Sequence, residues 1–318
     1  MKKLLVCILL LCFVHTAYAE ERMVINKNQE LWTESFGNLE KDNAVLFIHG
    51  CGAHAYCWND YFLKHFIDAG YFVIRFDQRN IGLSGPSYEK FDMIDLAADA
   101  ISILDDYGID KVHLVGHSMG GMVSQFIAAN YPDRLRSLTL MSTAPVGITP
   151  RLEKSLTWEE LKLTAIAVAY LTAPLPENYE KALPLYLWAL EFFNGDYLVD
   201  QELAIDYIDK QYHRTRHPYG EGPSLHAQAT FEMMRTLDER ANIFHYIDTP
   251  ALIIHGKKDA LILATRGGMA LNEALQDSTL NLIPGMGHAF FHKGLITEMC
   301  EMMLEFMEKH REVKALSL

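Results

Sequence analysis

Three side chains of the types that cooperate in acyl transfer follow one another along the chain: Ser118, Asp259 and His288. A serine hydroxyl is a weak nucleophile until a base removes its proton, and an acid must orient that base. Each of the three residues lies just past a short apolar run that is typical of a buried strand. The order predicts Ser118 as nucleophile, His288 as general base and acid, and Asp259 as the residue that orients His288.

The surroundings of Ser118 are the most specific part of this pattern. The stretch G-H-S-M-G at 116–120 follows a strand-like run at 112–115 and opens an apolar-periodic run that stops at 130–132. A strand, a sharp turn and a helix around G-x-S-x-G predict a nucleophile elbow, in which the glycines avoid collisions with the strand and the helix. The simpler interpretation is a glycine-rich turn without chemistry, and the flanking pattern favours the elbow.

Both proposed partners of Ser118 have rivals nearby. Asp259 could instead be a turn residue or a helix cap, and Asp248 is a second acid, although it precedes its strand and so belongs to the wrong end of the sheet. His288 could be a loop histidine, with His292 as a weaker rival. The position of all three residues at strand ends favours the catalytic assignment.

A developing oxyanion needs two hydrogen-bond donors. One is the backbone amide of Met119, directly after the nucleophile. The other is expected in the loop after an early strand, where the backbone of Cys51 follows His49 and Gly50. His49 is expected to brace this loop, and His49 and Gly50 are expected to border the substrate. A redox role for the Cys51 thiol is the alternative.

The elements that would position these residues alternate along the chain. Strands are expected at 31–36, 44–48, 71–76, 112–115, 138–141, 251–255 and 279–283, and helices at 56–69, 92–107, 299–309 and directly after Ser118. This alternation predicts an α/β fold with a mostly parallel, doubly wound sheet.

The alternation stops between 146 and 240, where the pattern is helical and rich in aromatic residues. We therefore expect one α/β core formed by 20–145 and 241–318, with an inserted helical cap at 146–240. Most cap aromatics are expected to pack against the core, and some are expected to line an apolar substrate pocket. The members named for this are Trp158, Tyr170, Tyr186, Trp188, Phe192, Phe193 and Tyr197.

The N-terminus has the pattern of a secretory signal at 1–19: a basic start, an apolar run, and a small-x-small cleavage site before Glu20. The predicted protein is exported, periplasmic or secreted, with no stable membrane span after cleavage. An uncleaved anchor is the alternative. A lipid anchor at Cys12 is disfavoured by the bulky Leu11 before it.

The net charge and the cysteine and motif content indicate which classes of binding partner to expect. The formal charge of the 318-residue chain is −13, and loss of Lys2 and Lys3 with the signal makes it −15, which gives no reason to bind nucleic acid. Cys51, Cys57 and Cys300 then remain, and whether the first two pair is left open. No spacing suggests a metal site, and no phosphate- or dinucleotide-binding pattern suggests a cofactor. Oligomeric state stays undetermined.

Taken together, the stretches HG at 49–50, DQRNIGLS, GHSMG, HGKKD and PGMGH resemble the α/β-hydrolase family across the mature chain. Within this family, the stretches LWTESFG, VIRFDQRNIGLS and PGMGH are most similar to the branch of aclacinomycin methylesterase-type enzymes and carboxylesterases. The family pattern D-x-R-G-x-G-x-S has Asn80 in place of its first glycine, and asparagine tolerates a left-handed backbone. Asp77, Arg79 and Ser84 are expected to be structural.

The leading prediction is an exported hydrolase that cleaves a small, largely apolar carboxylic ester through an acyl-enzyme on Ser118, without a cofactor. The same triad would also serve a lactonase, a C–C bond hydrolase or a perhydrolase. The resemblance argues against dehalogenase and epoxide hydrolase chemistry, which would require an aspartate at position 118. An aminopeptidase would need an acidic cap site, and nothing singles out Glu177 or Glu191. A ligand-binding protein on a hydrolase scaffold is the alternative of a different class.

Overall fold

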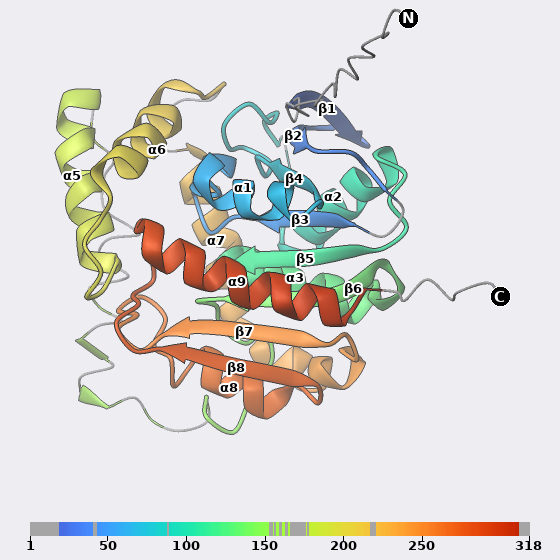
Figure 1. Cartoon of the computed structure of the whole chain (residues 1–318). Helices are drawn as coiled ribbons and strands as arrows, with labels where there is room; N and C mark the ends of the chain where they lie inside the picture. Colours follow the sequence, from blue (N-terminus) through green and yellow to red (C-terminus); the bar gives the residue numbers. More distant parts are fainter. Residues whose placement is uncertain are drawn as a thin grey trace, which may run out of the picture.

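The computed structural model describes residues 19–40, 43–87, 89–152, 178–216 and 221–311, together with 155, 157–158, 161–162, 165 and 176. Its centre is a sheet in which the described strands follow the order β1-β2-β4-β3-β5-β6-β7-β8. The pairs from β4 through β3, β5, β6 and β7 to β8 are parallel, whereas β1 and β2 join at one edge as antiparallel strands. The predicted mostly parallel, doubly wound sheet is confirmed (Figure 1).

Seven of these strands contain the apolar runs that predicted them. Their bounds are β2 Gln29–Phe36, β3 Ala44–Ile48, β4 Phe72–Phe76, β5 Val112–His117, β6 Leu135–Met141, β7 Ala251–Gly256 and β8 Ser278–Ile283. The first strand, β1 Glu20–Asn26, was not predicted. Its residues are mostly exposed because it is an edge strand, so it lacks the apolar run that marks a buried strand.

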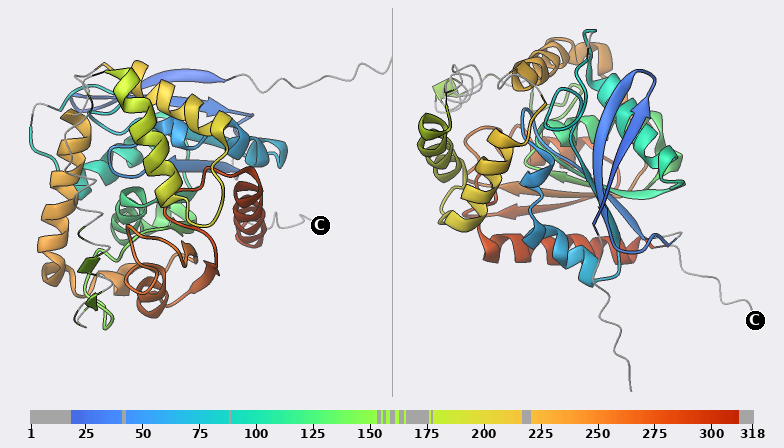
Figure 2. Two further views of the ribbon diagram at one scale, coloured as in Figure 1. Left: turned by 90° about the vertical axis from the view of Figure 1, so that its left-hand side faces the viewer. Right: turned by 90° about the horizontal axis from the view of Figure 1, so that it is seen from above.

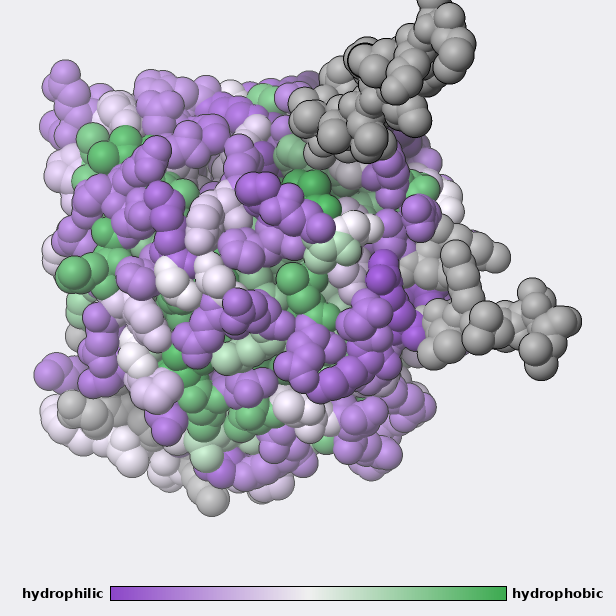
Figure 3. Space-filling view, in the orientation of Figure 1, coloured by the Kyte–Doolittle hydropathy of each residue, from purple (hydrophilic) through white to green (hydrophobic). Residues whose placement is uncertain are grey.

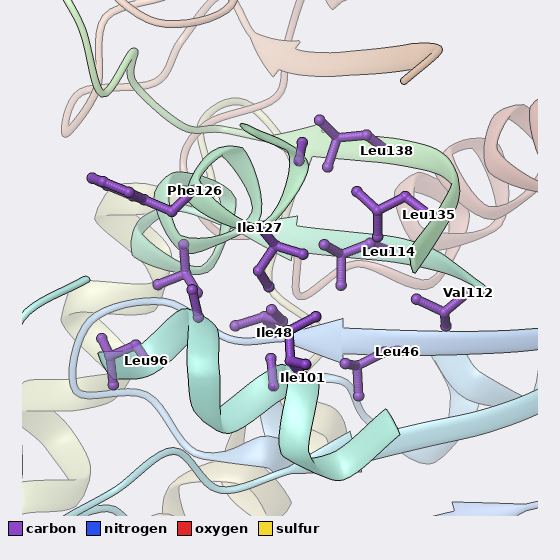
Figure 4. Packing of buried hydrophobic residues seen from close by; sticks show 14 of the residues in the cluster. Leu46, Ile48, Leu96, Ile101, Val112, Leu114, Phe126, Ile127, Leu135 and Leu138 are labelled. Atoms are coloured by element: carbon purple, nitrogen blue, oxygen red, sulfur yellow. The ribbon is translucent and has the colours of Figure 1, made fainter. Parts of the chain in front are cut away.

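Helices cover both faces of the sheet. On one face lie α1 Asp60–Asp68 and α9 Lys293–Lys309, and on the other lie α2 Met93–Asp106, α3 Met119–Asn130 and α8 Gly268–Ala274. Figure 4 shows side chains of β3, β5 and β6 meeting those of α2 and α3, with Ile48, Leu114 and Ile127 near the centre. This packing anchors the strands at whose carboxyl ends the candidate site lies.

One predicted helix is interrupted. The expected helix at 56–69 is a short 3₁₀ turn, Ala55–Cys57, followed by α1. Asn59 lies between the two pieces and caps the second, since its side chain accepts a hydrogen bond from the amide of Phe62 at 2.9 Å. Trp58, which ends the first piece, is buried against Phe47, Phe62 and Phe290.

Between β6 and β7 the chain forms helices α5 Tyr179–Phe193, α6 Gln201–His213 and α7 Glu221–Arg235, followed by the 3₁₀ turns Leu237–Arg240 and Ile243–Tyr246. These helices lie beside the carboxyl ends of the strands (Figures 1 and 2). We refer to α5, α6 and α7 as the cap.

The cap aromatics agree only in part with expectation. Phe193 is buried, and Tyr186 and Tyr197 pack partly buried against the core as predicted. In contrast, Trp158 is 81 % exposed, Trp188 52 % and Phe192 37 %. The prediction that most of them pack against the core is therefore wrong for these three, and Tyr170 lies outside the described residues. Periodicity indicates an apolar side of a helix but not what covers it. In Figure 3 apolar residues interrupt the hydrophilic surface at the left edge, over α5.

The predicted signal at 1–19 falls almost wholly on residues that the structure does not describe, and export stays a prediction. Within the described ranges, no helix has the length and apolar character needed to span a bilayer.

The buried His113 in strand β5 is expected to make the free energy of unfolding depend on pH under acidic conditions. Burial, helped by the nearby Arg136, lowers its pKa to about 3. The folded protein thus keeps His113 neutral while the unfolded chain binds a proton below its ordinary pKa, so stability falls as pH drops below that value. Between pH 7.5 and pH 5 we expect His113→Asn to lose about 2 kcal/mol less unfolding free energy than wild type. Denaturant titrations at both pH values measure this, with exposed His245→Asn as control; equal losses in all three proteins would contradict it.

Candidate active site

Ser118 occupies a strained turn between β5 and α3. Its backbone has φ 55° and ψ −121°, a left-handed φ that a non-glycine residue rarely adopts. A Cβ on Gly116 would lie 2.4 Å from the Gly120 carbonyl oxygen, and one on Gly120 would lie 2.2 Å from the Ile48 carbonyl oxygen. Both positions therefore require glycine, as the nucleophile-elbow prediction supposed.

Hydrogen bonds hold this turn. The Ser118 amide donates to the Met141 carbonyl at 2.9 Å, and the Thr143 hydroxyl donates to the Ser118 carbonyl at 2.6 Å. Within the described part of the chain, the Ser118 hydroxyl makes no hydrogen bond. Hydroxyl-to-base bonds are commonly long in ligand-free enzymes and shorten when substrate binds.

The predicted acid and base meet directly. His288 Nδ1 lies 2.9 Å from Asp259 Oδ2, and both side chains are buried. The other oxygen of Asp259 accepts the backbone amides of Leu261 and Ile262 at 2.9 Å and 2.7 Å. These bonds fix the plane of the carboxylate and therefore the ring of His288.

A second histidine, not singled out from the sequence, touches the same carboxylate. His255 Nδ1 accepts the Gly268 amide at 3.1 Å, so its proton is on Nε2, which lies 2.7 Å from the Ile262 carbonyl oxygen and 3.3 Å from Asp259 Oδ2. Burial alone would raise the pKa of Asp259, but His288 and His255 outweigh it and hold that pKa well below its usual value. His255 could have been identified from the sequence, because it is the first residue of the H-G-K-K-D stretch that contains Asp259.

His117 connects the elbow to the base. It precedes Ser118, its ring lies 4.9 Å from that of His288 between centroids, and its Nε2–H donates to the His288 carbonyl at 2.9 Å. Burial, with His288 close by, lowers the pKa of His117 to about 3. His117 is therefore a neutral donor that keeps the loop carrying His288 against the elbow.

The loop after β3 borders Ser118 from the other side. A Cβ on Gly50 would lie 3.1 Å from Ser118 Cβ and 3.5 Å from its hydroxyl oxygen. Neither the Cys51 amide nor the Met119 amide has a hydrogen-bond partner among the described residues. Two free amides beside the serine are what an oxyanion hole requires.

His49 is fully buried in this loop. Its Nδ1 lies 2.9 Å from the Gly50 carbonyl oxygen, and its Nε2 accepts the Gln78 amide at 3.1 Å. Burial lowers the pKa of His49 to about 4, so the ring is neutral. The side chain has the position of a loop brace, and a substrate contact here would have to come from the backbone. Gln78 had not been recognised as its partner.

The loop that carries His288 is held by the chain segment that ends α5. The Asp196 amide donates to the Gly285 carbonyl at 2.8 Å, and the Gly287 amide donates to the Asn194 carbonyl at 3.2 Å. The Ala289 amide donates to the Phe193 carbonyl at 2.8 Å. Nothing in the sequence indicated that the end of α5 and the residues after it would hold the loop of His288.

The D-Q-R-N-I-G-L-S stretch is structural, as expected. Asn80 has φ 61°, the left-handed conformation inferred from its place in the pattern. Arg79 forms a bidentate ion pair with Asp99 at 2.7 Å and 2.8 Å, and the Ser84 hydroxyl donates to the Asp77 carbonyl.

The rivals lie elsewhere. Asp248 is exposed at the start of β7, and His292 caps α9 by accepting the Leu295 amide at 3.1 Å. Cys51, Cys57 and Cys300 are all free thiols, so the structure contains no Cys51–Cys57 disulfide. Among the described residues, no group of three or more His, Cys, Asp or Glu side chains could hold a metal ion.

Several curated proteins share sequence with this chain. Rhodomycin D methylesterase from Streptomyces peucetius is 37 % identical over 123 residues, which is 38 % of this chain and 41 % of that enzyme. A putative carbamate hydrolase from Variovorax paradoxus is 30 % identical over 247 residues, 77 % of this chain and 85 % of that protein. A 2-hydroxy-6-oxononadienedioate/2-hydroxy-6-oxononatrienedioate hydrolase from a Pseudomonas species is 27 % identical and covers 78 % and 82 % of the two chains.

Solved structures agree on the fold. An esterase from Exiguobacterium antarcticum superimposes with a TM-score of 0.71 at 18 % identity, covering 90 % of this chain and 98 % of its own. A bromoperoxidase from Bacillus anthracis has a TM-score of 0.69 at 22 % identity, covering 90 % and 100 %. The sequence pattern of the family described as "alpha/beta hydrolase fold" matches residues 43–295. The chain therefore belongs to the α/β-hydrolase family.

Proposed function

We propose that this α/β hydrolase is an exported serine hydrolase that cleaves the carboxylic ester of a small, largely apolar substrate. The observation that carries the proposal is the buried His288–Asp259 pair beside the strained Ser118 turn. Strain at a non-glycine residue and a histidine oriented by a carboxylate are features of nucleophilic sites. A mere scaffold protein has no need of either.

In the proposed reaction His288 Nε2 takes the proton of the Ser118 hydroxyl as its oxygen attacks the ester carbonyl carbon. The amides of Cys51 and Met119 donate to the oxyanion that forms. The carbon–oxygen bond to the alcohol then breaks, and His288 returns the proton to the departing alcohol. Water repeats the sequence on the acyl-enzyme and releases the acid, while Asp259 holds the Nδ1 proton throughout.

The test is labelling of the protein, expressed with its own N-terminus, by a fluorophosphonate probe. We expect stoichiometric labelling of Ser118, found by peptide mapping, and loss of the label in Ser118→Ala. Ser142→Ala is a matched control, since Ser142 is also a buried serine with a left-handed φ, 42°, after a strand. Equal labelling of wild type and Ser118→Ala, or none while a control hydrolase reacts, would refute the proposal. The mass of the recovered protein tests the expected cleavage before Glu20.

A carbamate is the second candidate substrate class, because the relative with 30 % identity over 77 % of this chain is named a putative carbamate hydrolase. The two classes share the attack on Ser118 and differ in the acyl group, whose carbonyl carbon bears a carbon substituent in the ester and a nitrogen substituent in the carbamate. Matched aryl esters and aryl carbamates with the same leaving group separate them: the proposal expects a higher kcat/KM for the ester. A higher value for the carbamate would assign the second class.

A further inference from the structure

The outer side of the oxyanion loop, residues 49–52, is held by the cap. His226 of α7 is fully buried, and its Nδ1 accepts the Gly52 amide in a long hydrogen bond of 3.5 Å. Its Nε2–H donates to the Arg79 carbonyl at 2.9 Å. The ring stacks on that of His49, with centroids 6.4 Å apart and planes 16° apart. One cap side chain thus connects the oxyanion loop to the core loop that follows β4.

Three other cap residues lie against Cys51 or Gly52 of this loop. Gln211 of α6 donates to the Gly52 carbonyl at 3.3 Å. A Cβ on Gly52, whose φ is +65°, would lie 2.7 Å from Pro223 Cβ, so α7 packs directly on this backbone. The side chain of Thr230 lies beside the Cys51 thiol. The last turn of α6 and the first half and middle of α7 therefore contact the loop.

The geometry gives these contacts a catalytic consequence. The Cys51 amide belongs to the peptide group before the Cys51 Cα, and the Gly52 amide belongs to the peptide group after it. Because only two soft dihedral angles separate neighbouring peptide groups, a restraint on one limits the orientation of the other. Holding the Gly52 amide and carbonyl therefore restricts the direction in which the Cys51 amide points.

The proton positions on His226 are settled by its surroundings. Burial, with His49 close by, lowers the pKa of His226 to about 3, so the ring is neutral. A carbonyl at Nε2 and an amide at Nδ1 select the tautomer with its proton on Nε2. The ring is therefore an acceptor toward the oxyanion loop at neutral pH.

We propose that His226 is a positioning residue for the oxyanion hole, so that the cap contributes to transition-state stabilisation as well as covering the site. This inference rests on the function proposed above, because it assigns the Cys51 amide to the oxyanion. It adds a cap residue, remote from the reacting atoms, that sets the geometry of that amide.

Two substitutions separate the contacts of His226. His226→Gln keeps a donor for the Arg79 carbonyl but removes the acceptor for the Gly52 amide, whereas His226→Asn keeps the acceptor and removes the donor. We expect His226→Gln to lower kcat about tenfold, less than the roughly 100-fold loss on deleting an oxyanion donor, with KM changed little. His226→Asn should lose no more than about threefold, on the same scale. Rates are normalised to active sites counted with the fluorophosphonate, and exposed Gln228→Ala on α7 is the control.

A second readout does not depend on catalysis. Cys51 is partly exposed, whereas Cys57 and Cys300 are buried, and peptide mass spectrometry assigns iodoacetamide modification to each cysteine separately. Burial raises the pKa of the Cys51 thiol to about 12, so alkylation of the wild type is expected to be slow. Release of the loop from the cap should raise the alkylation rate of Cys51 several-fold in His226→Gln and leave it unchanged in Gln228→Ala.

The outcomes are distinguishable. A lower kcat together with faster Cys51 alkylation in His226→Gln, with His226→Asn close to wild type, supports the inference. Equal kcat and equal alkylation in His226→Gln and wild type would overturn it, as would equal losses of kcat in both variants with lower melting temperatures, which indicate a packing role. If the wild type neither reacts with the fluorophosphonate nor hydrolyses esters, the proposed function fails. The contact between cap and loop is tested separately, because it would be refuted by an unchanged rate of Cys51 alkylation in His226→Gln.

Discussion

Replacement of His288 by alanine is expected to lower kcat for ester hydrolysis by a factor on the order of 10⁵ to 10⁶, with little change in KM. The imidazole is the proposed acceptor of the Ser118 proton, and no other side chain of the site is placed to take that role. His117 and His255 both donate their Nε2 proton to backbone carbonyls. Neither can therefore substitute for His288 without breaking a buried hydrogen bond.

Steady-state kinetics of His288→Ala and His292→Ala together test this assignment. His292 is the competing histidine of the sequence, and the structure uses it as the cap of α9. We expect His292→Ala to lose about 1 kcal/mol of unfolding free energy and to keep kcat. If His292→Ala were the inactive variant and His288→Ala retained activity, the assignment of the base would be wrong.

Asp259→Asn is expected to lower kcat about 10⁴-fold while the protein stays folded. One oxygen of the carboxylate accepts two backbone amides, and the other accepts the Nδ1 proton of His288, with His255 Nε2 3.3 Å away. An asparagine that keeps its oxygen on the Leu261 and Ile262 amides turns its NH₂ group toward His288. His288 must then accept at Nδ1 and carry its proton on Nε2, which is the wrong tautomer to receive a proton from Ser118.

The control is Asp248→Asn, an exposed position at the opposite end of β7. It should keep kcat within about twofold of wild type, since exposed charges far from a site have small effects. Circular dichroism and active-site titration of Asp259→Asn check that the variant is folded, so that a loss of activity is not caused by unfolding. Full activity in Asp259→Asn would show that His288 needs no carboxylate, and an inactive Asp248→Asn would identify a different acid.

The sheet was predictable because buried parallel strands carry continuous apolar runs, which a sequence displays directly. Such runs mark β3 and β7, whose predicted bounds match the structure within one residue. The edge strand β1 has no such signal, and neither has the short helix α8, since seven residues hold too few turns for a period to show. The break before α1 falls at the buried Trp58 and Asn59, and periodicity does not mark it.

The candidate site was predictable to the extent that fold topology orders it. The ends of β5, β7 and β8 meet at one edge of a parallel sheet, so residues just past them come together whatever the loops do. The supporting residues had weaker signals. His255 precedes Gly256 in a stretch already singled out, whereas His226 lies in a cap helix more than a hundred residues from the loop it contacts.

The sequence by itself determined the α/β fold and the residues on which the proposed chemistry depends: Ser118 in a glycine-flanked turn, with Asp259 and His288 at later strand ends. These features depend on local spacing and on a topology that the alternation of strands and helices specifies. Only the tertiary structure decided how the site is held. The end of α5 and the segment after it hold the loop of His288, α6 and α7 contact the loop of Cys51, His117 donates to the His288 carbonyl, and His255 lies against Asp259. Such contacts join distant segments through side-chain shape and hydrogen-bond geometry, and no periodicity in a sequence records them.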